Sequence, residues 1–430
     1  MRLRSLLRLL AALALALALA AAGGTASAAQ RAGAGLKWVS GWTASPHGPY
    51  PSGFPFQPLP LGAVFPGEQA DNQTLRLIVH LSQGGKELRL HLSNLVGTQT
   101  VTFGEVTIGA RSSGADVSSG TLHQVLFGGQ ASVSVPAGGE VVSDPVDLST
   151  TPQEDLAVSI YVAGASGPMT WHAKAVTTSY ATLPNTGDHA GEAAGTSFTE
   201  PMRSWFFLNA IDVTVPPNRE SGTIVALGDS ITDGTQSTVD GNDRWPDDLA
   251  RRLLGATGGL KKEVVNEGIG GNRVVTDAGP GGPSALSRLD RDVFARPNLT
   301  DLIVFEGVND IGNGATASDV IGGLEQIIAR AHARGINAIG ATITPYEGSY
   351  TAPDAIRQTV NEWIRTSGAF DHMVDFDAIV RDPTHPSRID PMYDPGDHIH
   401  LNPAGYAAIA NAIPLSWFDD RPNGHHGGNG

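Results

Sequence analysis

The hydrophobic pattern of the chain changes near residue 216, and this change constrains the fold more than any other feature. From about residue 38 to residue 215, apolar side chains alternate with polar ones, as at Leu75, Leu77 and Val79. Alternation with a period of two is typical of half-buried β-strands. Beyond residue 216, short Val- and Ile-rich runs alternate instead with segments of helical periodicity. At 430 residues, the chain is also too long for one ordinary core, so we expect two domains of different class.

The first region is predicted to be an all-β sandwich. Its further strand candidates are short and lie between clusters of Gly, Pro, Ser and Asp, at residues 101–108, 132–135, 156–162 and 206–215. No segment of helical periodicity interrupts them. Many short strands at regular spacing favour an antiparallel, jelly-roll-like sandwich. We predict this domain over residues 36–216.

The second region is predicted to be an α/β domain over residues 220–420. Between its strand candidates, Trp245, Leu249 and Leu253 share one helical face. Strands that alternate with helices indicate a parallel sheet covered on both faces. Ligands of such sheets bind beyond the carboxyl ends of the strands. The predicted strands are residues 223–227, 263–266, 301–306, 336–343 and 373–376.

The N-terminus has the pattern of a secretory signal peptide. Arg2, Arg4 and Arg8 precede an almost pure Leu and Ala stretch at residues 9–22, and Ala-Ser-Ala at 26–28 offers a cleavage site. This apolar stretch is about 14 residues long, whereas a membrane-spanning helix needs roughly 20. We therefore predict a cleaved signal peptide at residues 1–28 and a secreted protein with no transmembrane anchor after cleavage.

Composition excludes several classes of function. The formal net charge is −15, whereas a protein that binds the phosphates of nucleic acid needs a basic surface. We therefore expect no nucleic acid partner. The chain has no cysteine, which excludes disulfides, thiol nucleophiles and thiolate metal sites. Residues 421–430 are rich in Gly, Asn and His and are predicted to be a disordered tail, with metal binding by His425 and His426 as the less favoured alternative.

Polar residues follow three of the predicted strands at their carboxyl ends. Gly228-Asp229-Ser230 places Ser230 at a helix start, where its backbone N–H and the helix dipole would face an oxyanion, although a capping serine is the alternative. The Gly-rich segment 266–272 lets backbone N–H groups approach a ligand, and it lacks the dinucleotide-binding spacing. Asn309 can offer its amide to the same oxyanion, although a tight Asn-Asp turn is the alternative.

An acid and a base lie close together near the C-terminus. Asp397 and His400 are three residues apart, so they can hydrogen-bond directly and leave the second ring nitrogen of His400 to accept a serine proton. Asp394 is the competing partner, and His398 is expected to point away from His400. A cation site at these residues is the alternative, but no zinc-ligand spacing supports it. We therefore expect no metal.

These four blocks resemble those of the SGNH, or GDSL, hydrolases and occur in the same order: Gly228-Asp229-Ser230, residues 270–272, Gly307-x-Asn309-Asp310 and Asp397-x-x-His400. The resemblance covers about residues 223–418 and implies a three-layer α/β/α flavodoxin-like fold. Ile231 stands where some members carry Leu, and there is no G-x-S-x-G elbow. The β region that begins at Trp38 resembles the accessory domain of secreted actinobacterial members.

The resemblance also implies roles for individual residues. Ser230 would be the nucleophile, His400 the base and Asp397 its orienting partner. The oxyanion hole would combine the N–H groups of Ser230 and Gly271 with the side chain of Asn309, with Gly270 as the alternative to Gly271. No metal or organic cofactor is implied.

The expected function is thus a secreted serine ester hydrolase that acts through an acyl-Ser230 intermediate. Its substrate would be an O-acylated carbohydrate or a lipid ester, either a small molecule or a polysaccharide. Arg273 and Glu306 lie beside the predicted site and are candidate substrate contacts. A salt bridge or solvation at the end of a strand would explain these two residues equally well.

The alternative function is a carbohydrate-binding protein with a non-catalytic hydrolase scaffold. The intact set of Ser230, Asn309, Asp397 and His400 argues against this alternative. Within the esterase hypothesis, sugars stack on exposed aromatic rings, so exposure of Trp42, Trp171 and Trp205 would favour a carbohydrate ester as the substrate. Burial of these three side chains in a core is an equal expectation, because Trp is usually well buried.

Overall fold

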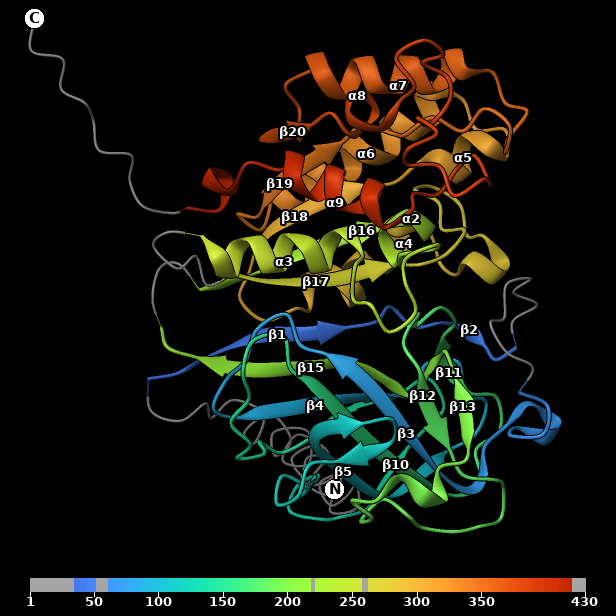
Figure 1. Ribbon diagram of the computed structural model, residues 1–430, viewed down its shortest axis with the longest axis vertical. Helices are drawn as coiled ribbons and strands as arrows, with labels where there is room; N and C mark the ends of the chain where they lie inside the picture. Colours follow the sequence, from blue (N-terminus) through green and yellow to red (C-terminus); the bar gives the residue numbers. More distant parts are fainter. Residues whose placement is uncertain (1–34, 52–60, 218–220, 257–261, 420–430) are drawn as a thin grey trace, which may run out of the picture.

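The computed structural model describes residues 35–51, 61–217, 221–256 and 262–419 (Figure 1). The predicted signal peptide at residues 1–28 and the predicted tail at 421–430, with His425 and His426, lie outside the described residues. None of the helices in the described ranges is long and apolar enough to cross a membrane.

The N-terminal region is an antiparallel β-sandwich, as predicted. A four-stranded sheet has the order β1-β15-β4-β9, and a larger sheet has the order β13-β12-β3-β10-β5-β6 with β7 and β8 also paired to β5. Leu75, Leu77 and Val79 of β3 are fully buried in the core between the sheets. The strands are β1 (Lys37–Thr43), β3 (Asp71–His80), β4 (Leu88–Ser93), β5 (Val101–Ser113), β6 (Asp116–Val117), β7 (His123–Gln124), β8 (Val133–Val135), β9 (Glu140–Val142), β10 (Asp155–Ala165), β12 (Ser179–Ala181), β13 (Glu200–Met202) and β15 (Leu208–Val215).

A third, small sheet brings the aromatic side chains of this region together. It consists of β14 (Trp205–Phe206), β11 (Thr170–His172) and β2 (His47–Pro49) in that order. The exposed fractions of the tryptophans at 42, 171 and 205 are 7%, 1% and 4%, so these rings belong to the core. They are not available for stacking against a sugar.

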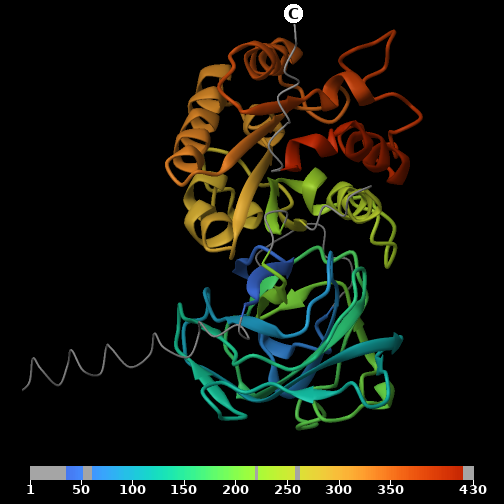
Figure 2. The same ribbon diagram turned by 90° about the vertical axis from the view of Figure 1, so that its left-hand side faces the viewer.

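The C-terminal region is a three-layer α/β/α domain, which confirms the predicted fold class. Its parallel sheet has the order β17-β16-β18-β19-β20, the flavodoxin-like order. Figure 2 shows α6 on one side of this sheet and α3 with α9 on the other. The pairing changes from antiparallel to parallel between Val215 and Gly222.

The elements of this domain are β16 (Gly222–Gly228), α2 (Ser230–Asp233), α3 (Trp245–Gly255), β17 (Lys262–Gly268), α4 (Ala285–Arg288), β18 (Leu299–Phe305), α5 (Val308–Gly312), α6 (Ala317–His332), β19 (Asn337–Ala341), α7 (Asp354–Thr366), β20 (His372–Val374), α8 (Phe376–Val380) and α9 (Pro403–Ala412). Short 3₁₀ or π turns lie at Pro66–Glu68, Gly195–Ser197, Gly279–Gly281, Leu289–Phe294 and Leu415–Phe418.

Two predicted strands end two residues earlier than expected, each for a local reason. The strand predicted at 336–343 stops at Ala341, and the N–H of Ile343 instead donates to the side chain of Asn361 at 2.8 Å. The strand predicted at 373–376 stops at Val374, because Asp375 caps the start of α8 by accepting from the N–H of Ala378.

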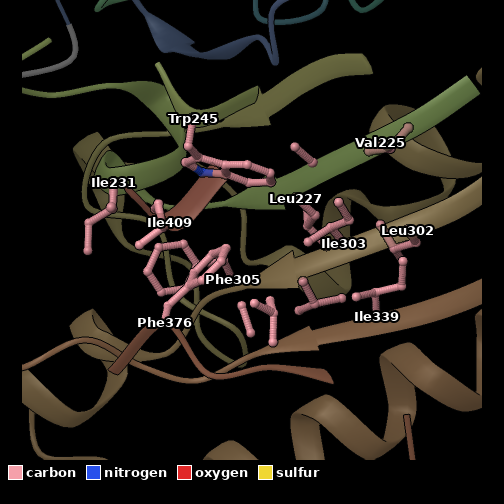
Figure 3. Close-up of a cluster of buried hydrophobic side chains, with 14 of the residues drawn as sticks. Val225, Leu227, Ile231, Trp245, Leu302, Ile303, Phe305, Ile339, Phe376 and Ile409 are labelled. Carbon is pink, nitrogen blue, oxygen red and sulfur yellow. The ribbon is translucent and has the colours of Figure 1, made fainter. Parts of the chain in front are cut away.

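Aromatic residues fix the sheet that supports the loops of the site. Trp245 of α3 and Phe305 of β18 both contact Phe376 edge to face, with ring centroids 6.0 and 5.0 Å apart (Figure 3). Ile409 of α9 lies in the same cluster as Leu227 of β16. This packing supports β16 and β18, and Ser230 and Asn309 lie just beyond their carboxyl ends.

The sandwich packs against the edge strand of the parallel sheet. β1 lies beside β17 in Figure 1, and polar side chains join the two domains. The N–H of Ser40 donates to Thr223 Oγ1 at 3.2 Å, and Thr43 Oγ1 donates to the carbonyl of Asn266 at 3.1 Å. The domain contact is thus built from specific hydrogen bonds as well as packing.

Candidate active site

Ser230 is the first residue of α2, directly beyond β16. The side chain of Asp229 accepts from the N–H of Ile231 at 2.9 Å, so Asp229 caps the helix and the capping role considered for Ser230 is filled. Ser230 Oγ instead lies 2.8 Å from Nε2 of His400. The backbone N–H of a first helical residue has no acceptor within its helix, so that of Ser230 is directed beyond the turn.

His400 is held by Asp397, as the spacing predicted. His400 Nδ1 lies 2.8 Å from Asp397 Oδ2, and Asp397 Oδ1 accepts from the backbone N–H of His400 at 3.0 Å. Gln236 donates to Oδ2 at 3.0 Å. Partial burial would raise the pKa of Asp397, but the hydrogen bonds from His400 and Gln236 hold this pKa well below its usual value. An ionised Asp397 leaves Nδ1 of His400 protonated and Nε2 facing the serine.

The competing acid binds the neighbouring histidine. Asp394 Oδ2 lies 2.6 Å from Nδ1 of His398, and Asp394 Oδ1 accepts from the backbone N–H of His398 at 3.1 Å. The His398 side chain is 53% exposed. His398 and Asp394 thus form a separate pair and make no hydrogen bond to His400.

The two glycines considered for the oxyanion hole differ in what their N–H groups do. The N–H of Gly270 donates to Asp233 Oδ2 at 3.0 Å. Gly271 is exposed and has a φ of 77°, and no hydrogen bond of its N–H is found in the described part of the chain. Gly271 is therefore the better placed of the two to donate to a ligand.

Asn309 lies in α5, beyond the carboxyl end of β18. Its Nδ2 donates to the carbonyl of Asn272 at 2.9 Å, and its Oδ1 accepts from the hydroxyl of Tyr350 at 2.7 Å. A side-chain amide has two N–H donors, so the contact with Asn272 leaves a second one. Tyr350 fixes which way the amide faces. No sequence pattern indicated Tyr350, because it lies in a loop far from any of the four blocks.

These groups line one cavity of about 400 Å³. Its wall includes Ser230, Gly271, Asn309 and His400. The cavity lies beyond β16 and β18, where the strand order of the sheet reverses, which is the place where ligands bind in such folds. Its volume is within the range of sites for small molecules.

The two candidate substrate contacts have different positions. Arg273 lines the cavity, and its Nε is buried without a hydrogen-bond partner in the described residues. Glu306 is only 2% exposed and is not among the residues that line the cavity. Burial, together with the nearby charge of Asp229, raises the pKa of Glu306 well above its normal value. The structure thus brings Arg273 to the cavity and encloses Glu306, because proximity in sequence does not fix the direction of a side chain.

The β-sandwich also contributes to the cavity. Lys174 lines it, and its Nζ donates to Thr235 Oγ1 at 2.8 Å. Burial lowers the pKa of this lysine, although the charges of Asp233 and Asp397 act in the opposite direction. The sequence did not indicate this residue, since no pattern within one domain reveals which side chains reach a site in the other.

Comparison with known proteins agrees with this arrangement. Residues 226–408 match the model of the GDSL-like lipase/acylhydrolase family. No curated protein matches the chain.

Several solved structures are similar to the chain. One is Est24, a carbohydrate acetylesterase from Sinorhizobium meliloti (16% identity, 45% of this chain and 96% of that chain, TM-score 0.36). Another is a GDSL-like lipase from Bacteroides thetaiotaomicron (18% identity, 47% and 90%, TM-score 0.35). A third is a member of the lipolytic protein G-D-S-L family from Veillonella parvula (19% identity, 44% and 94%, TM-score 0.33).

The matched region begins within β16 and ends within α9, so it contains Ser230, Asn309, Asp397 and His400. Residues 226–408 thus belong to the SGNH/GDSL hydrolase family, and the chain is a carboxylic ester hydrolase.

Proposed function

We propose that the chain cleaves carboxylic esters by a Ser-His-Asp acyl-enzyme mechanism. The observation that carries this proposal is the chain of contacts at the cavity. Ser230 Oγ lies 2.8 Å from His400 Nε2, and His400 Nδ1 lies 2.8 Å from Asp397 Oδ2. A nucleophile, a base and a group that orients the base are the elements that acyl transfer requires.

In the first step, His400 Nε2 accepts the hydroxyl proton of Ser230 while Ser230 Oγ forms a bond to the ester carbonyl carbon. The negative charge on the carbonyl oxygen is stabilised by the N–H groups of Ser230 and Gly271 and by Nδ2 of Asn309. The bond to the alcohol oxygen then breaks, and His400 returns the proton to the departing alcohol. Asp397 stays ionised throughout and stabilises the imidazolium.

In the second step, water replaces the alcohol. His400 accepts a proton from the water while the water oxygen attacks the acyl carbon. The acyl–oxygen bond to Ser230 breaks, the serine recovers the proton and the carboxylic acid leaves. With one water molecule consumed per ester, the sequence balances, and Ser230 and His400 return to their starting states.

We propose an O-acylated carbohydrate or a lipid ester as the substrate. The cavity volume of about 400 Å³ suits a short acyl group with part of its alcohol. Arg273 and Lys174 give the wall two basic side chains. The buried tryptophans at 42, 171 and 205 give no support to sugar stacking. Acetylated polysaccharides and phospholipids, assayed side by side, would separate the two ester classes.

Secretion is a further proposal, and it rests on the N-terminal sequence pattern alone. Expression of the full chain should release a protein that begins at Ala29 into the medium. N-terminal sequencing of the released protein tests this. Retention of Met1 on a cell-bound protein would contradict it.

The test of the mechanism is Ser230→Ala on a panel of short-chain aryl esters. We expect kcat to fall by roughly 10⁶-fold, the scale seen when a serine nucleophile is removed. A fluorophosphonate probe should label Ser230, as read by mass spectrometry of the intact protein and its peptides. Ser237→Ala is the matched control, because the hydroxyl of Ser237 donates to Gly234 and not to His400. Equal inactivity of wild type and Ser230→Ala over the whole panel would reject the mechanism.

A further inference from the structure

Asp233 connects the oxyanion loop, residues 268–272, to the β-sandwich. It is the last residue of α2 and is 3% exposed. Its Oδ2 accepts from the N–H of Gly270 at 3.0 Å. Its Oδ1 lies 3.0 Å from Nε2 of His172, the last residue of β11 in the other domain. One carboxylate thus joins a loop of the cavity to a side chain that the catalytic domain does not contain.

The contacts of His172 fix its protonation. Nε2 faces the carboxylate of Asp233, and Nδ1 lies 2.9 Å from the carbonyl oxygen of Ser45. Both partners are acceptors only, so both ring nitrogens must carry hydrogen and the ring is an imidazolium. Other charged or titratable groups near the pair are Arg244 and His47 beside the ring. Near Asp233 they are Lys174, Arg244, Asp229 and Tyr406. His172 is 4% exposed, so this is a buried ion pair.

A second histidine of the sandwich contacts the same side of the cavity. His47 Nδ1 lies 3.1 Å from the carbonyl of Pro280, and His47 Nε2 accepts from the N–H of Ala173 at 2.9 Å. Pro280 lines the cavity. A side chain at Gly282 would meet Cβ of His47 at 2.9 Å, so the two segments are in close contact. The sandwich therefore holds this wall at two points.

The oxyanion loop needs such support because it contains Gly270 and Gly271 in succession. Glycine restricts the backbone less than any other residue, and no side chain of these two residues can pack. The N–H of Gly270 is the point at which the loop is tied to Asp233. The next N–H along the chain is that of Gly271, the donor assigned above to the oxyanion.

We propose that His172 of the β-sandwich is a positioning residue for ester hydrolysis, which acts through Asp233 to hold the loop that presents the Gly271 N–H to the oxyanion. This inference rests on the proposed acyl-enzyme function. It gives the sandwich a role in the chemistry of the other domain.

The experiment compares His172→Ala and His172→Gln with wild type in the full chain, with an aryl ester as substrate. Displacement of a catalytic group by about 1 Å costs up to about 100-fold in rate, so we expect kcat of His172→Ala to fall roughly 10- to 100-fold. The KM should change by less than about threefold, because the loop stabilises the transition state rather than the ground state. Gln can donate to Asp233, so His172→Gln should recover part of kcat.

The matched control is His91→Ala. His91 Nε2 lies 2.7 Å from Oδ2 of the buried Asp212, a similar pair contained within the sandwich. Its removal should lower the midpoint of thermal unfolding while kcat stays within about twofold of wild type. A similar loss of kcat in His91→Ala would show that general destabilisation, not positioning, lowers the rate, and would overturn the inference.

The inference is also overturned if folded His172→Gln and His172→Ala both keep wild-type kcat. If His172→Ala does not fold, His172→Gln decides alone. A kcat below that of wild type with an unchanged KM is then the supporting result. Failure of the proposed function itself looks different, because wild type would then hydrolyse no ester and fluorophosphonate would not label Ser230.

Discussion

Two histidine–aspartate pairs of the molecule contact or contribute residues that line one cavity, His400 with Asp397 directly and His172 with Asp233 through Gly270. His400 and Asp397 are three residues apart on a partly exposed segment. His172 and Asp233 are 61 residues apart, and each side chain is 4% exposed. The first pair is set up by a short stretch of chain, whereas the second exists only when the two domains are packed. In the proposed mechanism, proton transfer would thus depend on local geometry and oxyanion binding on the tertiary fold.

The largest expected effect concerns the local pair. Replacing Asp397 by Asn should lower kcat about 10⁴-fold, since the imidazole loses the group that fixes its tautomer. Steady-state kinetics on an aryl ester would measure this. His398→Ala is the matched control, because His398 forms the same kind of pair with Asp394 at 2.6 Å. Equal losses in both variants would mean that the whole segment, not one pair, supports the reaction.

A smaller effect is expected at Tyr350, which also lines the cavity. Tyr350→Phe removes the donor that fixes Asn309, and a hydrogen bond contributes about 0.5–1.5 kcal/mol, so kcat should fall roughly two- to tenfold. Tyr346→Phe is the control, because the hydroxyl of Tyr346 donates instead to Pro353 at 3.2 Å. An unchanged kcat in Tyr350→Phe would show that the amide of Asn309 is oriented without it.

The buried pair, His172 and Asp233, is also expected to make the stability of the fold depend on pH. Burial lowers the pKa of His172, but Asp233 more than offsets this and raises the pKa above its usual value near 6.5. The imidazolium therefore stabilises the fold fully below about pH 6.5, and this contribution is lost as pH rises through the higher native pKa.

Burial raises the pKa of Asp233, but the charge of His172 more than offsets this effect and lowers that pKa. The contribution of Asp233 to the free energy of unfolding is therefore lost only as pH falls through its lowered native pKa. Breaking a buried pair typically costs about 3–5 kcal/mol, so wild type should exceed His172→Ala by roughly that free energy of unfolding near pH 6. Urea denaturation between pH 5 and about 9 should show the difference shrinking at high pH. A constant difference would contradict a charged His172.

The same contrast explains what the sequence could predict. The contacts among Ser230, Asp397 and His400 could be predicted because each residue lies at a strand end or within one turn of its partner. His172, Tyr350 and Gln236 were not, since their contacts cross long stretches of chain. Tertiary packing alone brings them to the site.

The fold class was predicted more completely than its elements. The two hydrophobic periods indicated a sandwich and an α/β domain, and both are present. α7 was not predicted because its buried face includes Arg357 and Asn361, which weaken the apolar stripe. Glu306 was placed near the site by its position in the chain, although its side chain is enclosed. The hydrophobic pattern of the sequence predicts the order of helices and strands better than it predicts the direction of single side chains.

The packing of β1 beside β17 has a consequence for anyone who shortens this enzyme. β17 is the outermost strand of its sheet, and an uncovered outer strand offers free backbone groups to other molecules. Thr43 of β1 occupies one of these groups, the carbonyl of Asn266. A fragment that begins at β16 would lose this cover and would tend to self-associate during purification. Engineers who exchange modules should therefore transfer residues 37–45 together with the catalytic part.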